Sequence, residues 1–158
     1  MPSDTLIFDT GQNIVGIFSV KERKYTAYTG ARLQIGSDRI LRARDIVSYN
    51  GNRWDLFDLA RFSGLGDDVT AKVLGLHTDM REIIWGRIRG RCLADTYKEH
   101  FPRIRSFPDT HIGSNWRDVY MTYKLWKCWK AGKLKVLGGQ FVWNSAKVED
   151  KAIFLTPK

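Results

Sequence analysis

The sequence predicts an α+β fold, and three of its features lead to that prediction. Short β-branched and aromatic runs occupy the first 30 residues, apolar residues recur at helical spacing through the middle, and a long capped segment near the C-terminus precedes a Gly-Gly turn. The chain has 158 residues, of which 43% are hydrophobic and 27% charged, as is usual for a folded globular protein. We expect either one domain, 1–158, or two small units, 1–50 and 51–158.

The N-terminal part predicts a small β-meander followed by a helix. Runs rich in β-branched and aromatic residues indicate strands at residues 6–8, 14–20 and 25–28. A further short strand is expected at residues 33–35. Ser37 or Asp38 can then cap a helix that continues to about Ser48, because Ile40, Leu41, Ile46 and Val47 are apolar.

The middle of the chain is predicted to be helical. Apolar spacing indicates one helix at residues 55–62, which Ser63 and Gly64 end, and a second at residues 67–75. A third helix begins at Thr78 or Asp79. One side of this helix is apolar, and Arg81, Trp85 and Arg89 form an adjoining row at four-residue spacing.

The C-terminal part predicts a loop, a long helix and a hairpin. Pro102 and Pro108 favour a loop over residues 101–112, and Asn115 caps a helix that extends to about Ala131. Strands at residues 133–136 and 140–143 would form a hairpin around Gly138 and Gly139. A last strand is expected at residues 152–155.

Positive charge is concentrated in one stretch of the chain. The formal net charge is +9, from 26 Lys and Arg against 17 Asp and Glu. Residues 81–135 contain thirteen basic and five acidic residues, a net of +8, together with four of the six tryptophans. Basic side chains neutralise phosphates and aromatic rings can stack on bases, so this composition favours nucleic acid as the partner.

The composition also limits the compartment and the cofactors. Cys92 and Cys128 could form at most one disulfide, and no secretory signal or membrane-length apolar run is present, so we expect an intracellular or cytoplasmic protein that does not bind membranes. The three histidines and the two cysteines lack metal-ligand spacing, and no phosphate-binding glycine loop is present. We therefore expect no cofactor, apart from Mg²⁺ if the protein is a nuclease.

Two segments resemble parts of known DNA-binding motifs. Residues 54–73 resemble the first half of a helix-turn-helix, with Ala60 and Gly64 at that family's spacing. Residues 115–143 resemble the end of a winged helix, whose helix enters the major groove and whose hairpin contacts the backbone. With the basic stretch, these resemblances predict contacts to nucleic acid, most of all double-stranded DNA, from Arg81, Trp85, Arg87, Arg89, Arg91, Arg117, Lys124, Lys127, Lys130, Lys133 and Lys135.

A nuclease is the alternative that the N-terminal half suggests. Gly16-Ile-Phe18 followed by Tyr28-Thr-Gly30 resembles the paired motif of the GIY-YIG nucleases, although Phe18 and Thr29 depart from it. The resemblance implies a catalytic Tyr28, a following arginine, which is Arg42 or Arg44, and Glu82 as the metal ligand. Separately, Asp9 followed by Glu22-Arg-Lys24 has the residue order of restriction-like nucleases, in which paired carboxylates hold Mg²⁺.

The sequence thus favours a basic nucleic-acid-binding protein without catalysis, of a size and charge frequent among phage and mobile-element proteins. The first alternative is a small Mg²⁺-dependent endonuclease. The second is a protein-interaction or inhibitor module that presents a basic, Trp-rich face to an acidic partner protein. The oligomeric state does not follow from the sequence.

Overall fold

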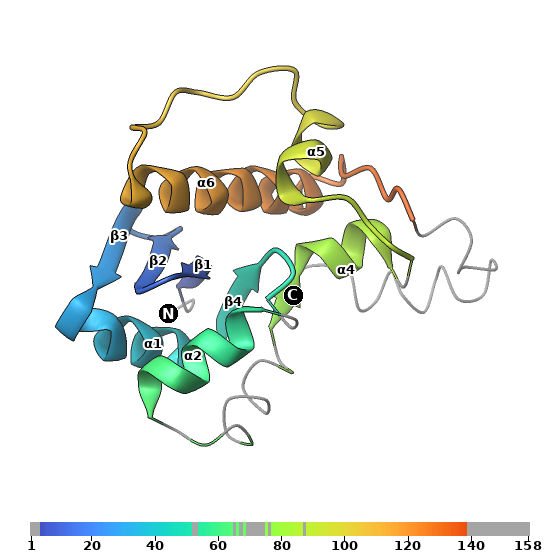
Figure 1. Ribbon diagram of the computed structural model, residues 1–158. Helices are drawn as coiled ribbons and strands as arrows, with labels where there is room; N and C mark the ends of the chain where they lie inside the picture. Colours follow the sequence, from blue (N-terminus) through green and yellow to red (C-terminus); the bar gives the residue numbers. More distant parts are fainter. Residues whose placement is uncertain are drawn as a thin grey trace.

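A five-stranded mixed sheet organises the molecule in a computed structural model, which describes residues 4–51, 54–64, 66, 68, 75, 77–86 and 88–138. The strand order is β3-β2-β1-β4-β5 (Figure 1). The strands are β1 (Thr5–Gly11), β2 (Ile14–Ser19), β3 (Lys24–Thr29), β4 (Asp45–Ser48) and β5 (Thr78–Asp79). The predicted α+β class is confirmed.

The predicted β-meander is confirmed and forms one half of the sheet. β1 and β2 pair antiparallel from Leu6 opposite Ser19 to Gly11 opposite Ile14, and β2 pairs antiparallel with β3. β4 then lies on the other side of β1 and runs parallel to it, as β5 does to β4. Because β5 follows residue 51 in the chain, one sheet spans the two predicted units.

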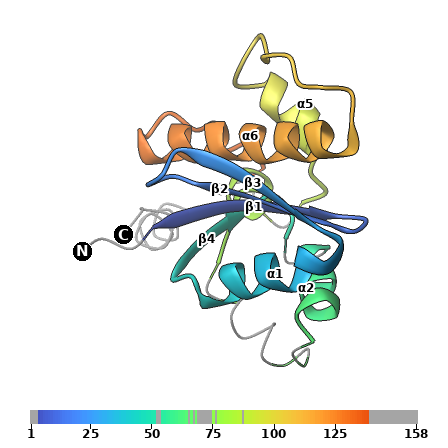
Figure 2. The same ribbon diagram turned by 90° about the vertical axis from the view of Figure 1, so that its left-hand side faces the viewer.

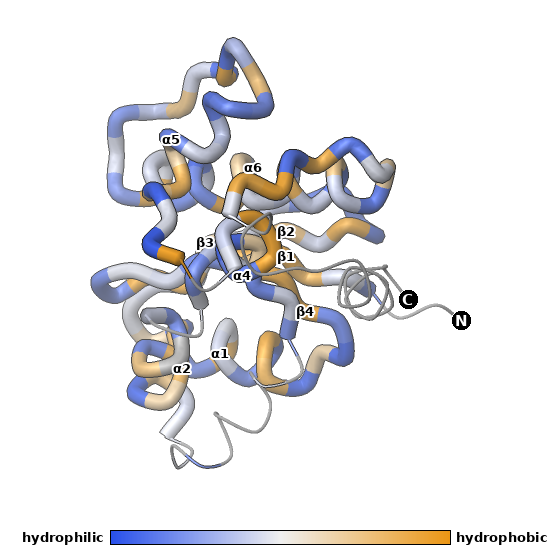
Figure 3. The backbone as a smooth tube through the Cα atoms, turned by 90° about the vertical axis from the view of Figure 1, so that its right-hand side faces the viewer, coloured by the Kyte–Doolittle hydropathy of each residue, from blue (hydrophilic) through white to orange (hydrophobic). Residues whose placement is uncertain are grey.

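Helices cover both faces of the sheet (Figure 2). On one face lie α1 (Leu33–Arg42) and α2 (Asp55–Ser63), and on the other lies α6 (His111–Lys130). Phe8, Ile17 and Leu59 belong to the first apolar core, and Ile7, Val119 and Leu125 to the second. Side chains alternate between the faces of a strand, so β1 contributes to both cores. In Figure 3 the apolar colours accordingly lie over the central strands β1 and β2.

The region between residues 33 and 48 differs from the prediction. Residues 33–35 are not a strand but the first turn of α1, which is preceded by a 3₁₀ turn, η1 (Gly30–Arg32). The predicted helix to Ser48 ends at Arg42, and Ile46 and Val47 lie in β4. Both side chains are buried, and their positions pair with Leu6 and Ile7 of β1. Pairing with a distant strand thus overrides the local helical spacing.

The remaining helices are close to the predicted positions. α2 ends where Gly64 adopts a left-handed conformation. α4 (Met80–Trp85) is capped by Asp79, whose side chain accepts from the Arg81 amide, but it ends before Arg89, so the predicted row of Arg81, Trp85 and Arg89 does not form on one helix. A short helix, α5 (Leu93–Lys98), was not predicted. The loop with the two prolines runs to Thr110, which caps α6 by accepting a hydrogen bond from the Gly113 amide. The predicted cap, Asn115, is instead a buried residue inside α6.

The predicted hairpin is the main remaining difference. Residues 133–136 do not form a strand, and Lys135 lies beside the chain just after α5, where its amide donates to His100 Nε2. The predicted helix at 67–75 lies mostly outside the described residues, and the predicted strands at 140–143 and 152–155 lie wholly outside them. Cys92 and Cys128 are both free thiols. None of the helices in the part of the chain that the structure describes is long and apolar enough to cross a membrane.

Candidate active site

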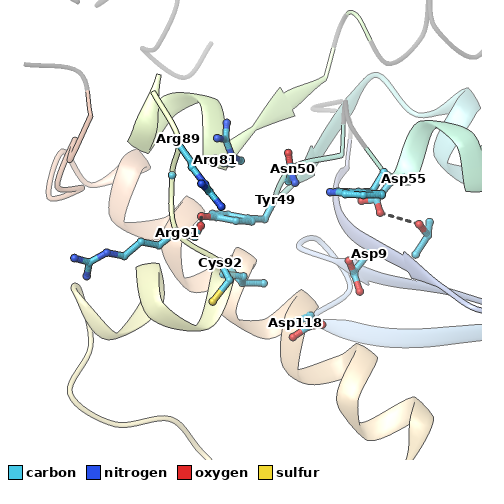
Figure 4. A pocket seen from close by; sticks show the side chains of 13 residues that line it. Asp9, Tyr49, Asn50, Asp55, Arg81, Arg89, Arg91, Cys92 and Asp118 are labelled. Atoms are coloured by element: carbon cyan, nitrogen blue, oxygen red, sulfur yellow. Dashed lines mark hydrogen bonds between the residues drawn. The ribbon is translucent and has the colours of Figure 1, made fainter. Parts of the chain in front are cut away.

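A pocket lies at the end of β1, where successive strands of the chain are added to opposite sides of the sheet. β2 and β3 extend the sheet on one side of β1, whereas β4 and β5 extend it on the other. In open sheets, ligands bind outside the carboxyl ends of parallel strands at such a switch point. A cavity of about 470 Å³ occupies this position. Its walls include Asp9 at the end of β1, Asp55 at the start of α2 and Asp118 on α6 (Figure 4).

Asp9 is held in place by α6. The Asn115 Nδ2 donates to the Asp9 carbonyl over 3.2 Å and to its carboxylate Oδ2 over 3.3 Å. The Asn115 Oδ1 in turn accepts from the Tyr25 hydroxyl over 2.6 Å. Gly16 makes this approach of α6 to β2 feasible, because a Cβ there would lie 1.6 Å from Asn115 Oδ1. Residues from β1, β2, β3 and α6 therefore cooperate to orient one carboxylate.

Asp55 has a polar atom that is buried without a partner. The residue is only 4% exposed, and its Oδ1 lies 2.7 Å from the Thr10 hydroxyl. The other carboxylate atom, Oδ2, is buried and makes no hydrogen bond to the part of the chain that the structure describes. An unsatisfied buried carboxylate oxygen is costly, so it suggests a ligand that the protein alone does not supply.

One hydroxyl serves two carboxyl groups in this cluster. Thr10 Oγ1 lies 2.7 Å from Asp55 Oδ1 and 2.8 Å from Asp58 Oδ2. A hydroxyl has one hydrogen, so both contacts are hydrogen bonds only when one carboxyl group carries a proton. In agreement, burial raises the pKa of Asp55 to about 7, and the charge of Asp58 adds to this rise. Below about pH 7 the Asp55 carboxyl group therefore holds a proton that a cation could replace.

The other two carboxyl groups are also shifted toward the protonated form. Burial raises the pKa of Asp9 well above its usual value, and the charges of Asp55 and Asp118 raise it further. Burial raises the pKa of Asp118, while Arg117, whose Nε lies 3.6 Å from Asp118 Oδ1, partly opposes this. Perturbed carboxyl groups that line one pocket are typical of functional sites.

The donor atoms suit a hard cation, although they are not gathered into one ligand set. Within the described ranges, no three His, Cys, Asp or Glu side chains are close enough to hold one metal ion together. Carboxylate oxygens are the ligands that Mg²⁺ prefers, and it commonly uses one or two of them, with waters and substrate phosphates completing its shell. Asp9 and Asp55 fit that requirement, with Asp118 on the same wall of the pocket.

The opposite wall of the pocket is basic and aromatic. Arg81, Arg89 and Arg91 line it. Tyr49 lies between them and the acidic wall, which carries Asp9, Asp55 and Asp118 (Figure 4). Trp54 also borders the pocket and is 66% exposed, although it directly precedes Asp55. The pocket therefore combines carboxylates, guanidinium groups and an exposed aromatic ring.

The structure separates the basic residues that were predicted to act together. Arg81, Arg89 and Arg91 line the pocket, whereas Trp85 is buried, with its Nε1 donating to Thr96. On α6 and beyond, the ammonium groups of three lysines lie over aromatic rings, and a fourth donates to the Glu99 carbonyl; these are Lys124, Lys127, Lys130 and Lys135. Arg117 is beside Asp118, Lys133 is exposed, and Arg87 lies outside the described residues.

The residues of the two nuclease resemblances do not come together. Tyr28 is buried on the outer strand β3, where its hydroxyl accepts from Arg39, whereas Glu82 lies on α4 beyond the opposite edge of the sheet. Arg42 and Arg44 line a different pocket. Glu22 and Lys24 lie at the end of β2 and start of β3, whereas Asp9 pairs with Gly16 near the other end.

Two of the three pocket carboxylates were missed by sequence reasoning. The sequence order groups Asp9 with Glu22 and Lys24, which the structure places away from the pocket, and helical spacing assigns Asp55 and Asp118 to helices. For Asp55, the signal is a carboxylate at the start of the helix that follows the parallel strand β4, whereas Asp118 lies on α6, where no strand pattern marks it. The signal for Asp55 was hidden because residues 45–48, which form β4, were predicted as part of a helix.

Comparisons with known proteins add no relative to this picture. No protein-family model, curated protein or solved structure matches the chain.

Proposed function

We propose that this protein is a divalent-cation-dependent phosphodiesterase that acts on nucleic acid. The observation on which this rests is the buried, unpartnered Oδ2 of Asp55, in a pocket shared with Asp9 and Asp118. The arginines of the opposite wall and the net charge of +9 support a polyanionic substrate. Our hypothesis is therefore a catalytic site at this pocket, and no longer one around Tyr28 and Glu82.

The chain's own residues have distinct roles in this proposal. Asp9 and Asp55 would hold the cation, which supplies Lewis-acid stabilisation of charge on the phosphoryl oxygens. Asn115 keeps Asp9 aimed at the pocket. Asp118, whose pKa is raised, lies on the same wall as Asp9, where it can accept a proton from an attacking water. The arginine wall holds the substrate phosphates.

Trp54 supports a nucleic acid over other phosphodiesters. An indole ring that is 66% exposed beside a polar pocket can stack on an unpaired base, which is a contact that every base can make. The second candidate function is binding of nucleic acid without cleavage, because the same arginines and Trp54 would bind a nucleic acid in either case.

The test is cleavage of labelled single-stranded DNA, duplex DNA and RNA with Mg²⁺ or Mn²⁺, and with EDTA. We expect cleavage that EDTA abolishes, and a loss of about a hundredfold or more in Asp9→Asn, Asp55→Asn and Asp118→Asn. Asp38→Asn on α1, away from the pocket, is the control and should cleave like the wild type. If the nucleic acid is bound in a salt-dependent way but stays uncut, the protein binds nucleic acid without cleaving it. If it is neither bound nor cut, the alternative of an acidic protein partner is the one that stands.

A further inference from the structure

A short segment of the basic wall is fixed at both of its ends. We call residues 88–91 the arginine strap. At one end, Arg81 Nη2 donates to the Ile88 carbonyl over 3.2 Å, and at the other the Tyr49 hydroxyl donates to the Arg91 carbonyl over 2.7 Å. The strap therefore has a defined position, although it has no regular secondary structure.

The middle of the strap is packed against a buried ring. A Cβ at Gly90 would lie 2.4 Å from Trp85 Cγ, so only glycine allows this approach without a shift. Trp85 is itself held by its hydrogen bond to Thr96, which also contacts the Tyr49 hydroxyl over 2.8 Å. Arg89 thus extends from a backbone segment that is fixed before any ligand binds, which lowers the entropic cost of binding.

The two arginines of the strap differ in what their side chains contact. The Arg91 guanidinium pairs with Glu99 over 3.0 Å, and its side chain points away from the acidic wall (Figure 4). The Arg89 side chain instead extends toward Tyr49 and the pocket, and Arg81 lies beside it. Arg89 is therefore the residue of the strap that faces the substrate.

On the basis of the proposed function, we infer that Arg89 binds the phosphate next to the one that is cleaved. Asp9, Asp55 and Asp118 lie on one wall and Arg89 on the opposite wall, with Tyr49 between them, so the guanidinium is positioned for a second phosphate beside the one at the carboxylates. A guanidinium matches a phosphate geometrically and stays charged at all relevant pH values. Arg89 would thus select a polynucleotide, with a neighbouring phosphate, over an isolated phosphodiester.

The experiment compares two substrates of the intact protein. One is thymidine 5′-(p-nitrophenyl phosphate), which has a single diester and no neighbouring phosphate, and the other is a short oligothymidylate. In Arg89→Gln we expect kcat/KM on the oligonucleotide to fall about tenfold or more, chiefly through KM, with less than about a twofold change on the small diester. Arg23→Gln, in the turn before β3, is the matched control and should change neither.

A neutral linkage separates phosphate binding from a structural effect. The modified oligonucleotide has one methylphosphonate beside the cut in place of a phosphate. With the wild type, its kcat/KM should fall below that of the normal oligonucleotide by about the same factor that Arg89→Gln causes on the normal oligonucleotide. Arg89→Gln itself should be nearly insensitive to that linkage, because the contact is already absent. Equal losses on both substrates, or full sensitivity of the variant to the neutral linkage, would overturn the inference.

Failure of the proposed function is recognised by a different result. If the wild type cleaves neither substrate, the catalytic proposal fails, and Arg89 is then tested by binding alone. Arg89→Gln should lower the slope of log K against log salt for the oligonucleotide by about one unit. An unchanged slope would overturn the role of Arg89 independently of catalysis.

Discussion

Single residues at the acidic wall carry the clearest chemical signal in this protein. Thr10 Oγ1 lies within hydrogen-bond distance of both Asp55 and Asp58, and Asp55 Oδ2 is buried with no hydrogen-bond partner among the residues that the structure describes. Such an arrangement destabilises the folded chain locally unless a proton or a cation neutralises it. Functional sites often retain strain of this kind.

The raised pKa of Asp55 predicts how stability depends on pH. The ordinary pKa is 3.8 and the folded value is about 7, so between these values the folded chain holds a proton that the unfolded chain has lost. Stability from this group is therefore greatest at low pH and falls as pH rises from about 4 to 7. Relative to Asp55→Asn, the free energy of unfolding of the wild type in EDTA should fall by up to about 1.4 kcal/mol per pH unit.

Urea denaturation across that pH range measures this effect. Added Mg²⁺ should recover stability in the wild type at pH 7.5, because the cation replaces the lost proton, and should do so far less in Asp55→Asn. Parallel pH profiles for the two proteins would show that Asp55 does not titrate in this way.

At the scale of elements, α6 connects the core to the candidate site. Its first half brings Asn115 and Asp118 to the end of β1, and its second half buries Leu125 and Trp126. Ring contacts join it to the preceding loop, where Phe107 packs near Trp116 and Tyr120. The position of the site residues on α6 therefore depends on packing along the whole helix.

Two substitutions on α6 test this dependence. Leu125 is 0% exposed, so Leu125→Ala should lower the free energy of unfolding by about 2–5 kcal/mol through the lost contacts and the cavity. Ile112 is 48% exposed on the same helix, and Ile112→Ala should change it by about 0.5 kcal/mol or less. Chemical denaturation compares them, and similar losses in both would contradict the described packing.

At the scale of the whole molecule, the excess positive charge is distributed over more than the pocket. Lys124, Lys127 and Lys130 lie over the rings of Phe101, Tyr123 and Trp126, so their stems pack while their charges stay near the surface. These lysines come from a helix packed on the sheet, which differs from the predicted helix followed by a hairpin. They can still extend the electrostatic surface for a polyanion.

The salt dependence of binding tests whether α6 belongs to the interface. The double variant Lys124→Ala with Lys127→Ala should weaken binding to nucleic acid and lower the salt slope by about one unit for each lost phosphate contact. Fluorescence anisotropy over a salt series measures this. A slope equal to that of the wild type would exclude the lysines of α6 from the interface.

The sequence alone was sufficient where local patterns decide the structure. The strands of the meander, the helix ending at Gly64 and the body of the long C-terminal helix follow from β-branched runs, turn residues and apolar spacing within a few neighbours. The cap of that last helix does not, because Thr110 and not Asn115 begins it. The clustering of basic residues with tryptophans is likewise a property of composition, and the prediction of a nucleic-acid partner rests on it.

Tertiary structure alone decided what depends on distant contacts. Residues 45–48 form a strand because they pair with β1, and that pairing brings the chain after β4 next to Asp9. Asn115 and Asp118 reach Asp9 across more than 100 residues of sequence, through the packing of α6 on the sheet. No local pattern encodes such proximity, because it arises from the burial of whole faces against one another.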